Sequence, residues 1–306
     1  MLIPIINEGQ RIINELKRAQ AARIANFVDI VICDGGSSDG STAEEILKNL
    51  SVNTLLTKQD TGKQGAQLRM GIFWSLKRGY DGILTIDGND KDSIEDVPKF
   101  IEKLQEGYDF VQGSRFIKGG KAINTPLIRY LAVRLIHAPI ISLTARHWFT
   151  DTTNAYRAYS AKYLSDERVK PLREVFFSYE LLAYLSTRAN QIGYRSTEIP
   201  VTRAYPPTGK TPTKISFFKG NNELMKILIK IHFVERSADN KLDFERTLSK
   251  FQAGLALAQF KKFRHRGEGK LREFYLVKNR AEVLLKLRQA GYFFDAFWYE
   301  KPVSPE

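Results

Sequence analysis

Short apolar runs alternate with stretches of helical periodicity through residues 1–115. Apolar runs of about four to eight residues are typical of buried strands, whereas apolar residues spaced three to four apart are typical of amphipathic helices. The pattern predicts strands at Met1–Ile6, Val28–Cys33, Gly82–Ile86 and Phe110–Gln112, and helices at Gln10–Ala25 and Ile94–Gln105. Such alternation predicts an α/β fold, in which a mostly parallel, Rossmann-like sheet carries helices on both faces.

The second half of the chain is less regular. Residues Thr125–Ala145 form an amphipathic stretch in which Pro139 is expected to break or kink a helix. A helix at Val175–Ile192 and a strand at Thr197–Val201 follow, and from about Ser237 the pattern indicates a separate helical segment. We therefore predict a domain of residues 1–235 and a small helical appendage of residues 236–306.

Composition narrows the classes of protein. Of the 306 residues, 43% are hydrophobic and 26% charged, which excludes a wholly disordered chain. The single cysteine, Cys33, excludes a disulfide framework and fits a reducing compartment. The net charge of +13 suits an anionic ligand or surface, but no zinc-finger or RNA-binding spacing accompanies it, so no nucleic-acid partner is expected. Because no apolar stretch reaches the roughly 18 residues of a membrane span, we expect at most peripheral membrane attachment.

Acidic and glycine-rich segments follow two of the predicted strands. Asp34–Ser41 comes directly after one strand and Asp87–Asp92 after another, and Ser41–Glu44 has the form of a helix capping box. Ligands of open α/β sheets lie beyond the carboxyl ends of the strands, so we expect the site there.

Asp87 and Asn89 are the candidate ligands for Mg²⁺ or Mn²⁺ bound to a nucleotide diphosphate, because these cations prefer carboxylate and carbonyl oxygens. The alternative is that Asp-Gly-Asn-Asp simply forms a turn. The chain lacks both a G-x-x-x-x-G-K-S/T loop and a G-x-G-x-x-G segment after its first strand. The sequence therefore lacks the phosphate-binding motifs that would indicate a kinase-type NTPase or a dinucleotide dehydrogenase.

Taken in order, the motifs resemble family 2 glycosyltransferases of the GT-A fold, in particular the branch similar to dolichyl-phosphate mannose synthase. The resemblance spans about residues 1–220 and rests on segments 3–8, 34–41, 62–66, 87–89, 113–115, 151–157, 179–182, 198–201 and 209–214. Family members usually have a longer first strand, whereas here only three residues precede Pro4, so we expect either that the true start lies upstream or that this strand is short.

The resemblance implies a role for each matching position. The nucleotide-sugar site would comprise Pro4, Asn7, Glu8, Asp34, Gly62, Lys63, Gly65 and Asp87. Asp87 and Asn89 take the D-x-D positions that hold metal and diphosphate. Asn89 replaces the second carboxylate and so gives up one charge, for which Asp90 or Asp92 are possible substitutes.

Catalytic and acceptor residues are also implied. Arg115 would stabilise phosphate, and Arg203, Lys210 and Lys214 would bind a phosphate acceptor. For a hydroxyl acceptor, Glu180 matches the general-base region and Asp151 competes with it. A phosphate acceptor needs no base, in which case both carboxylates would orient basic residues. Arg157 is expected either to pair with one of these carboxylates or to form an exposed salt bridge.

The amphipathic stretch has two interpretations. With Arg129 and Arg134, it would suit an anionic membrane face and a polyprenyl-phosphate acceptor. Alternatively, it is a helix packed on the sheet. His137 is interpreted as a packed residue.

The main hypothesis is a metal-dependent inverting glycosyltransferase that uses a nucleotide-diphosphate sugar and a lipid-phosphate or glycan acceptor in surface polysaccharide or glycolipid synthesis. We expect it in the cytoplasm, peripheral on the inner membrane face. One alternative is a catalytically impaired nucleotide-sugar-binding scaffold; another is nucleotidyl transfer to a sugar phosphate. Segments 251–260, 279–291 and 298–303 resemble the C-terminal part of pyridoxal-phosphate sugar aminotransferases. That enzyme's cofactor core and lysine are not matched, so no aminotransferase activity is expected.

Overall fold

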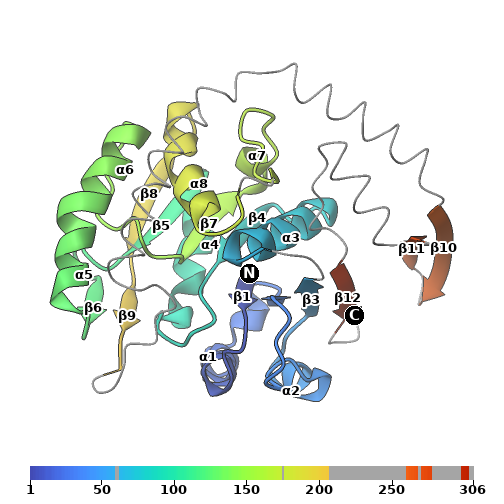
Figure 1. Cartoon of the computed structure of the whole chain (residues 1–306). Helices are drawn as coiled ribbons and strands as arrows, with labels where there is room; N and C mark the ends of the chain where they lie inside the picture. The colour runs from blue at the N-terminus through green and yellow to red at the C-terminus, as the bar shows by residue number, and fades with distance from the viewer. Residues whose placement is uncertain (59–61, 174–175, 207–259, 268–269, 278–297, 303–306) are drawn as a thin grey trace. The chain divides into compact units, whose positions relative to one another are not determined.

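The computed structural model describes residues 1–58, 62–173, 176–206, 260–267, 270–277 and 298–302 (Figure 1). The chain divides into two compact units, Met1–Phe233 with Asp295–Glu306, and Val234–Phe294. In the second unit, β10 (Phe260–Gly267) and β11 (Lys270–Val277) pair as an antiparallel hairpin. The expectation of a helical appendage is therefore wrong for these residues, while the boundary at residue 235 stays a prediction.

An eight-stranded sheet forms the centre of the first unit, in the order β12-β3-β2-β1-β4-β7-β5-β8. Its strands are β1 (Leu2–Ile5), β2 (Val31–Asp34), β3 (Thr54–Lys58), β4 (Gly82–Thr85), β5 (Phe110–Ser114), β7 (Arg157–Ser160), β8 (Ser196–Pro200) and β12 (Trp298–Pro302). Strands β3, β2, β1 and β4 are parallel neighbours, as are β5 and β8. Strand β7 is antiparallel to both β4 and β5, and β12 to β3. The predicted mostly parallel α/β sheet is confirmed.

Helices cover both faces of this sheet. They are α1 (Gln10–Ala21), α2 (Glu44–Asn49), α3 (Gln64–Lys77), α4 (Val97–Gln105), α5 (Leu127–Ala132), α6 (Ala138–Ala145), α7 (Ala161–Leu164) and α8 (Glu180–Gln191), with 3₁₀ turns at Ile24–Asn26 and Ile94–Asp96. A small parallel pair, β6 (Lys121–Ile123) with β9 (Thr202–Ala204), lies outside the main sheet.

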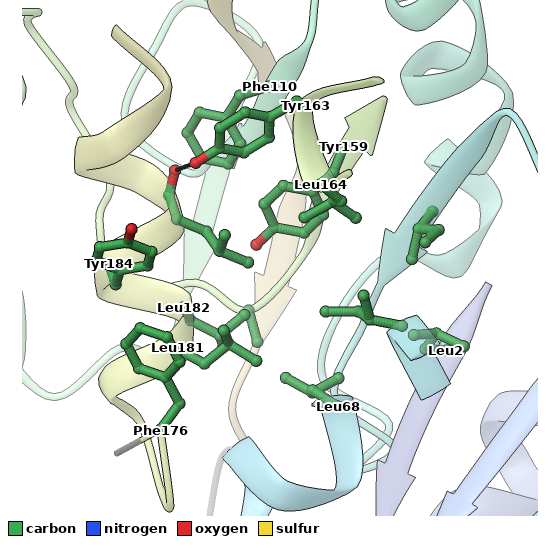
Figure 2. Close-up of a cluster of buried hydrophobic side chains, with 14 of the residues drawn as sticks. Leu2, Leu68, Phe110, Tyr159, Tyr163, Leu164, Phe176, Leu181, Leu182 and Tyr184 are labelled. Carbon is green, nitrogen blue, oxygen red and sulfur yellow. Dashed lines mark hydrogen bonds between the residues drawn. The ribbon is translucent and has the colours of Figure 1, made fainter. Parts of the chain in front are cut away.

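Alternation along each strand divides the core into two clusters. Leu2 and Cys33 belong to the cluster that includes residues of α3, α6 and α8, whereas Ile3 and Ile32 belong to the one formed with α1, α2 and α4. Successive strand side chains point to opposite faces, so one strand supplies both clusters. Figure 2 shows the first cluster, in which the Tyr163 hydroxyl donates to the carbonyl of Leu185 at 2.7 Å.

Several predicted boundaries shift for local reasons. Helix α1 ends at Ala21 because Arg23 adopts a left-handed conformation with φ of 53°. The expected capping box is wrong: α2 begins at Glu44, and the Ser41 hydroxyl donates to Asp39 at 2.6 Å. Strand β1 has four residues, as do β2 and β4.

Of the expected break or kink at Pro139, the break is wrong, because Leu127–Ala145 is one continuous helix of 19 residues. A π-helical turn at Val133–His137 lies just before Ala138 and Pro139, and the wider turn accommodates a residue that cannot donate a backbone hydrogen bond. By length and composition this helix is sufficient to cross a membrane, so the expectation that no stretch would be long enough is wrong.

Helix α3 lies directly on β1 and β2 because Gly71 has no side chain. A Cβ at this position would lie 2.7 Å from Cys33 Sγ and 2.8 Å from Leu2 Cδ1. Gly71→Ala should lower the free energy of unfolding by about 1–3 kcal/mol, the usual effect of overpacking, measured by urea denaturation. Lys77→Ala, at an exposed position of the same helix, is the control and should change it by less than about 0.5 kcal/mol. Equal stability of both variants would contradict this packing.

Candidate active site

The polar segments predicted to form the site meet at one edge of the sheet. Strands β1, β2, β4 and β5 share one direction, because β1, β2 and β4 are parallel and β7 is antiparallel to both β4 and β5. Their carboxyl ends carry Asn7, Asp34, Asp87 and Arg115. The fold therefore brings together residues that lie far apart in the sequence.

Arg203 in β9 is buried and joins two carboxylates of the loop after β4. Its Nη2 lies 3.1 Å from Asp87 Oδ2, and its Nη1 donates to Asp92. Burial alone would lower the pKa of Arg203, but the charges of Asp92 and Asp87 outweigh it and hold this pKa well above its usual range. Arg203 thus remains a cation and fixes the position of Asp87.

Asp87 and Asn89 lie side by side, as their spacing suggested. Asn89 Nδ2 donates to Asp87 Oδ2 at 3.3 Å, while Asn89 Oδ1 is buried and has no hydrogen-bond partner among the described residues. Gln64, the first residue of α3, donates to Asp87 Oδ1 at 2.8 Å. Sequence reasoning missed Gln64, although it lies between Lys63 and Gly65 in the predicted loop.

Helix α1 holds the other side of this loop. The buried carboxylate of Glu15 accepts the Asp90 backbone N–H at 2.8 Å, and Asp90 has a left-handed φ of 58°. Arg18 binds the Asp90 carboxylate at 3.0 Å and the Asp92 carbonyl at 2.7 Å. Both proposed substitutes for Asn89 are thus paired with arginines, Asp90 with Arg18 and Asp92 with Arg203.

A second buried ion pair joins Arg115 to Asp151. Arg115 Nε and Nη2 lie 2.6 and 2.9 Å from the two oxygens of Asp151, whose side chain is fully buried. Burial would raise the pKa of Asp151, but Arg115 outweighs it and lowers that pKa below its usual value. Glu198 accepts the backbone N–H groups of Thr150 and Asp151 at 3.0 and 3.1 Å. Asp151 therefore orients a cation in this geometry.

Glu180 lies at the first position of α8 and is half-buried. Its Oε2 accepts the Ser178 N–H at 2.6 Å. The turn before α8 packs against the Gly62–Gly65 loop, since a Cβ on Gly65 would lie 2.5 Å from the carbonyl oxygens of Phe176 and Ser178. The structure thus brings the candidate base close to the predicted nucleotide loop.

The loops after β1 and β2 are joined by hydrogen bonds. Asp34 accepts from the N–H and hydroxyl of Ser37 at 2.9 and 2.6 Å, and the same hydroxyl accepts the Asn7 N–H at 2.9 Å. Pro4 lies within β1, and Glu8 pairs with Arg11 at 2.7 Å. These four predicted nucleotide-site residues therefore lie along one edge formed by β1, β2 and their loops.

Two further predictions have different outcomes. Arg157 pairs with no predicted carboxylate and is not exposed, so both expectations for it are wrong. Its buried guanidinium donates to the Ser186 hydroxyl and to the carbonyls of Thr152, Asn154 and Leu182. Lys210 and Lys214 lie outside the described residues.

Tyr205 gathers three cations beside this loop, a feature that sequence reasoning missed. Lys91 Nζ lies 5.3 Å from its ring centroid, and the guanidinium carbons of Arg129 and Arg203 lie at 5.8 and 5.9 Å. Arg129 also donates to the Tyr205 hydroxyl at 2.8 Å. A cavity of about 280 Å³ lies here, lined by Arg11, Asn89, Asp90, Lys91, Ala204, Tyr205 and Pro206.

Known proteins that are similar to this chain include sugar transferases. The model of the family described as glycosyl transferase family 2 matches residues 1–167. The chain is 28% identical over 207 residues to an undecaprenyl-phosphate mannosyltransferase of Micrococcus luteus, covering 66% of this chain and 81% of that protein. It is 25% identical over 213 residues to a polyprenol monophosphomannose synthase of Mycolicibacterium smegmatis, covering 66% and 76%.

Among solved structures, glucosyl-3-phosphoglycerate synthase of Mycobacterium tuberculosis, in complex with Mn²⁺, UDP and phosphoglyceric acid, is similar in fold. The TM-score is 0.52 at 13% identity, over 90% of this chain and 85% of that one.

We expect Asp151→Asn to destabilise the protein, because it leaves the Arg115 charge buried without a counter-charge. The free energy of unfolding, measured by denaturant titration, should fall by about 3–5 kcal/mol. Glu106→Gln removes the exposed pair with Lys103 and should leave the free energy of unfolding nearly unchanged. If the free energy of unfolding fell equally little in both variants, Asp151 would not be the partner that holds Arg115.

Glu15→Ala should release the Asp90 N–H from its acceptor, whereas Glu15→Gln keeps an oxygen at the same place. Amide hydrogen exchange at Asp90 should accelerate about tenfold or more in the alanine variant and much less in the glutamine variant. Unchanged exchange in Glu15→Ala would show that α1 does not hold this loop.

Proposed function

The chain belongs to the family 2 glycosyltransferases, and we propose that it transfers a sugar from a nucleotide-diphosphate sugar to the phosphate of a polyprenyl phosphate. The observation that carries this proposal is the amide oxygen of Asn89, which has no hydrogen-bond partner among the described residues and lies beside the Asp87 carboxylate, next to buried Arg203. Relatives named as undecaprenyl-phosphate and polyprenol-phosphate mannose transferases support the acceptor class.

The residues present fit a divalent cation. Asp87 and Asn89 offer one carboxylate and one free amide oxygen, and Mg²⁺ or Mn²⁺ usually takes one or two protein ligands together with substrate phosphates and water. Among the described residues no group of three acidic, histidine or cysteine side chains is gathered for a metal. When bound, the metal would neutralise the charge of the leaving diphosphate.

Positively charged side chains would stabilise the phosphate oxygens that take part in the transfer. In an inverting transfer, a phosphate oxygen of the acceptor forms a bond to the anomeric carbon while the bond from that carbon to the diphosphate oxygen breaks. Guanidinium groups stabilise such oxyanions by paired, charge-assisted hydrogen bonds. Arg115 and Arg203 come from adjacent backbone segments, because the Val201 N–H donates to the Ser114 carbonyl at 3.0 Å. We propose that they hold the acceptor phosphate and the leaving diphosphate.

The ion pairing of Asp151 supports a phosphate acceptor over a hydroxyl acceptor. A hydroxyl must lose a proton to a base, whereas a phosphate is already an anion at neutral pH. With Asp151 bound to Arg115 through both oxygens, the carboxylate is engaged as a counter-charge. Glu180 remains the candidate if a hydroxyl acceptor is used.

A polyprenyl phosphate is embedded in a membrane through its chain, so we propose that the enzyme works at a membrane surface. The lone Cys33 agrees with the reducing, cytoplasmic side.

The proposal is tested by incubating the full chain with UDP-, GDP- and dTDP-sugars, Mg²⁺ or Mn²⁺, and a short-chain polyprenyl phosphate, with products identified by mass spectrometry. At least one donor should yield a glycosyl polyprenyl phosphate, and the matching polyprenol should remain unmodified. Transfer to the polyprenol instead would overturn the acceptor assignment. Nucleotide binding without turnover would support a scaffold, and pyrophosphate release from NTP and a sugar phosphate would support nucleotidyl transfer.

Asp87→Ala removes one metal ligand and one partner of Arg203, so the transfer rate should fall by about 10²–10³-fold or more. Asp81→Ala, which removes an exposed carboxylate at the opposite end of β4, is the matched control and should retain activity. Asn89→Asp restores a second charge and should lower the metal concentration needed for half-maximal rate. A fully active Asp87→Ala variant would refute the metal assignment.

A further inference from the structure

The helix Leu127–Ala145 leaves an unusual number of large apolar side chains uncovered. Leu127, Leu135 and Leu143 are 70%, 69% and 83% exposed, and Trp148, just beyond the helix, is 69% exposed. Ile128, Leu131 and Ile136 are exposed as well. Scattered apolar residues are ordinary on a protein surface, but a run along one helix indicates a binding surface. We call these seven residues the apolar face.

The charged residues of the segment that carries the apolar face have a single sign. Residues 116–150 contain five basic residues and neither Asp nor Glu: Lys118, Lys121, Arg129, Arg134 and Arg146. All except Arg129 are exposed. Apolar side chains in a basic surrounding complement a bilayer that contains anionic lipid, where each positive charge near the surface adds to binding.

The helix is fastened to the domain along its other side. Val133, Ile141 and Ala145 are buried, and Gln191 of α8 donates to the Thr144 carbonyl at 2.9 Å. Figure 1 shows α5 and α6 at the left of the view, and α6 packs against α8. A bilayer-spanning position would require the helix to leave these contacts, so a position parallel to the membrane surface agrees better with the packing.

The apolar face is also continuous with the candidate active site. Arg129, in the first turn of the helix, binds the hydroxyl of Tyr205, whose ring lies against Arg203. On the next turn, Arg134 lies 5.4 Å from the ring centroid of Phe116, the residue after Arg115. A lipid phosphate in the headgroup layer beside this helix would therefore lie near the buried arginines.

We propose that the apolar face lies in the headgroup region of an anionic bilayer. This position would bring the candidate active site close to a polyprenyl phosphate embedded in the membrane. This inference rests on the proposed function for the acceptor, while the membrane contact itself is independent of catalysis. The leucines and Trp148 would enter the boundary between headgroups and acyl chains, and the basic residues would contact lipid phosphates.

The test is flotation of the full chain with phosphatidylcholine vesicles, with and without about 30% phosphatidylglycerol, an anionic lipid at a fraction chosen to give a negative surface potential. The wild type should bind the anionic vesicles more strongly. The double variant Leu135→Asp/Leu143→Asp should lose at least about tenfold in partitioning, because it removes two exposed leucines that would become buried in the bilayer. Phe27→Asp, which alters a side chain 54% exposed elsewhere on the domain, is the control and should bind as the wild type does.

Activity separates this inference from the proposed function. With a water-soluble short-chain polyprenyl phosphate, the double variant should keep the wild-type rate; with a long-chain acceptor in vesicles its rate should fall about tenfold or more, in line with its partitioning. Equal vesicle binding by variant and wild type would overturn the membrane contact while leaving the transfer reaction intact. A wild-type dimer that dissociates in the double variant would also overturn it, since a second copy would then cover the apolar face.

Discussion

The geometry of the site depends on one buried cation. Arg203 binds Asp87 and Asp92, which lie 116 and 111 residues away in the sequence. Charges removed from water are tolerated only where they are paired, so the loop between these carboxylates has little freedom to move. Glu15 and Arg18 hold the same loop from α1. The position of Asp87 is thus determined from two sides.

A second buried arginine, Arg115, is also paired with a carboxylate, because it donates to both oxygens of Asp151. In each pair a carboxylate keeps a guanidinium fixed in a place where phosphate oxygens would otherwise be its natural partners. Preorganised cations need no rearrangement when charge develops on a leaving diphosphate. Under the proposed transfer between two phosphates, both guanidinium groups would already be in position before the reaction.

Local pattern was sufficient to predict the strands β1, β2, β4, β5 and β8, and the acidic loops at their carboxyl ends, because hydrophobic alternation and turn residues act over short distances. It was not sufficient for β7, whose sequence Arg-Ala-Tyr-Ser includes a buried arginine. Nor did it reveal the roles of Tyr205 or Gln64, since each depends on partners distant in the chain. The helix Leu127–Ala145 was underestimated because its arginines and Pro139 interrupt the apolar run, although the π-helical turn keeps it continuous.

In the proposed mechanism, Asp87 and Asn89 form a metal-dependent diphosphate site. Isothermal titration calorimetry of the full chain with UDP, GDP and dTDP, in Mn²⁺ and then in EDTA, measures this property without turnover. At least one nucleotide should bind in Mn²⁺ and lose about tenfold or more in affinity in EDTA, because its phosphates would lose the bridging cation. Binding of equal strength in both conditions, or no binding of any nucleotide, would contradict the account.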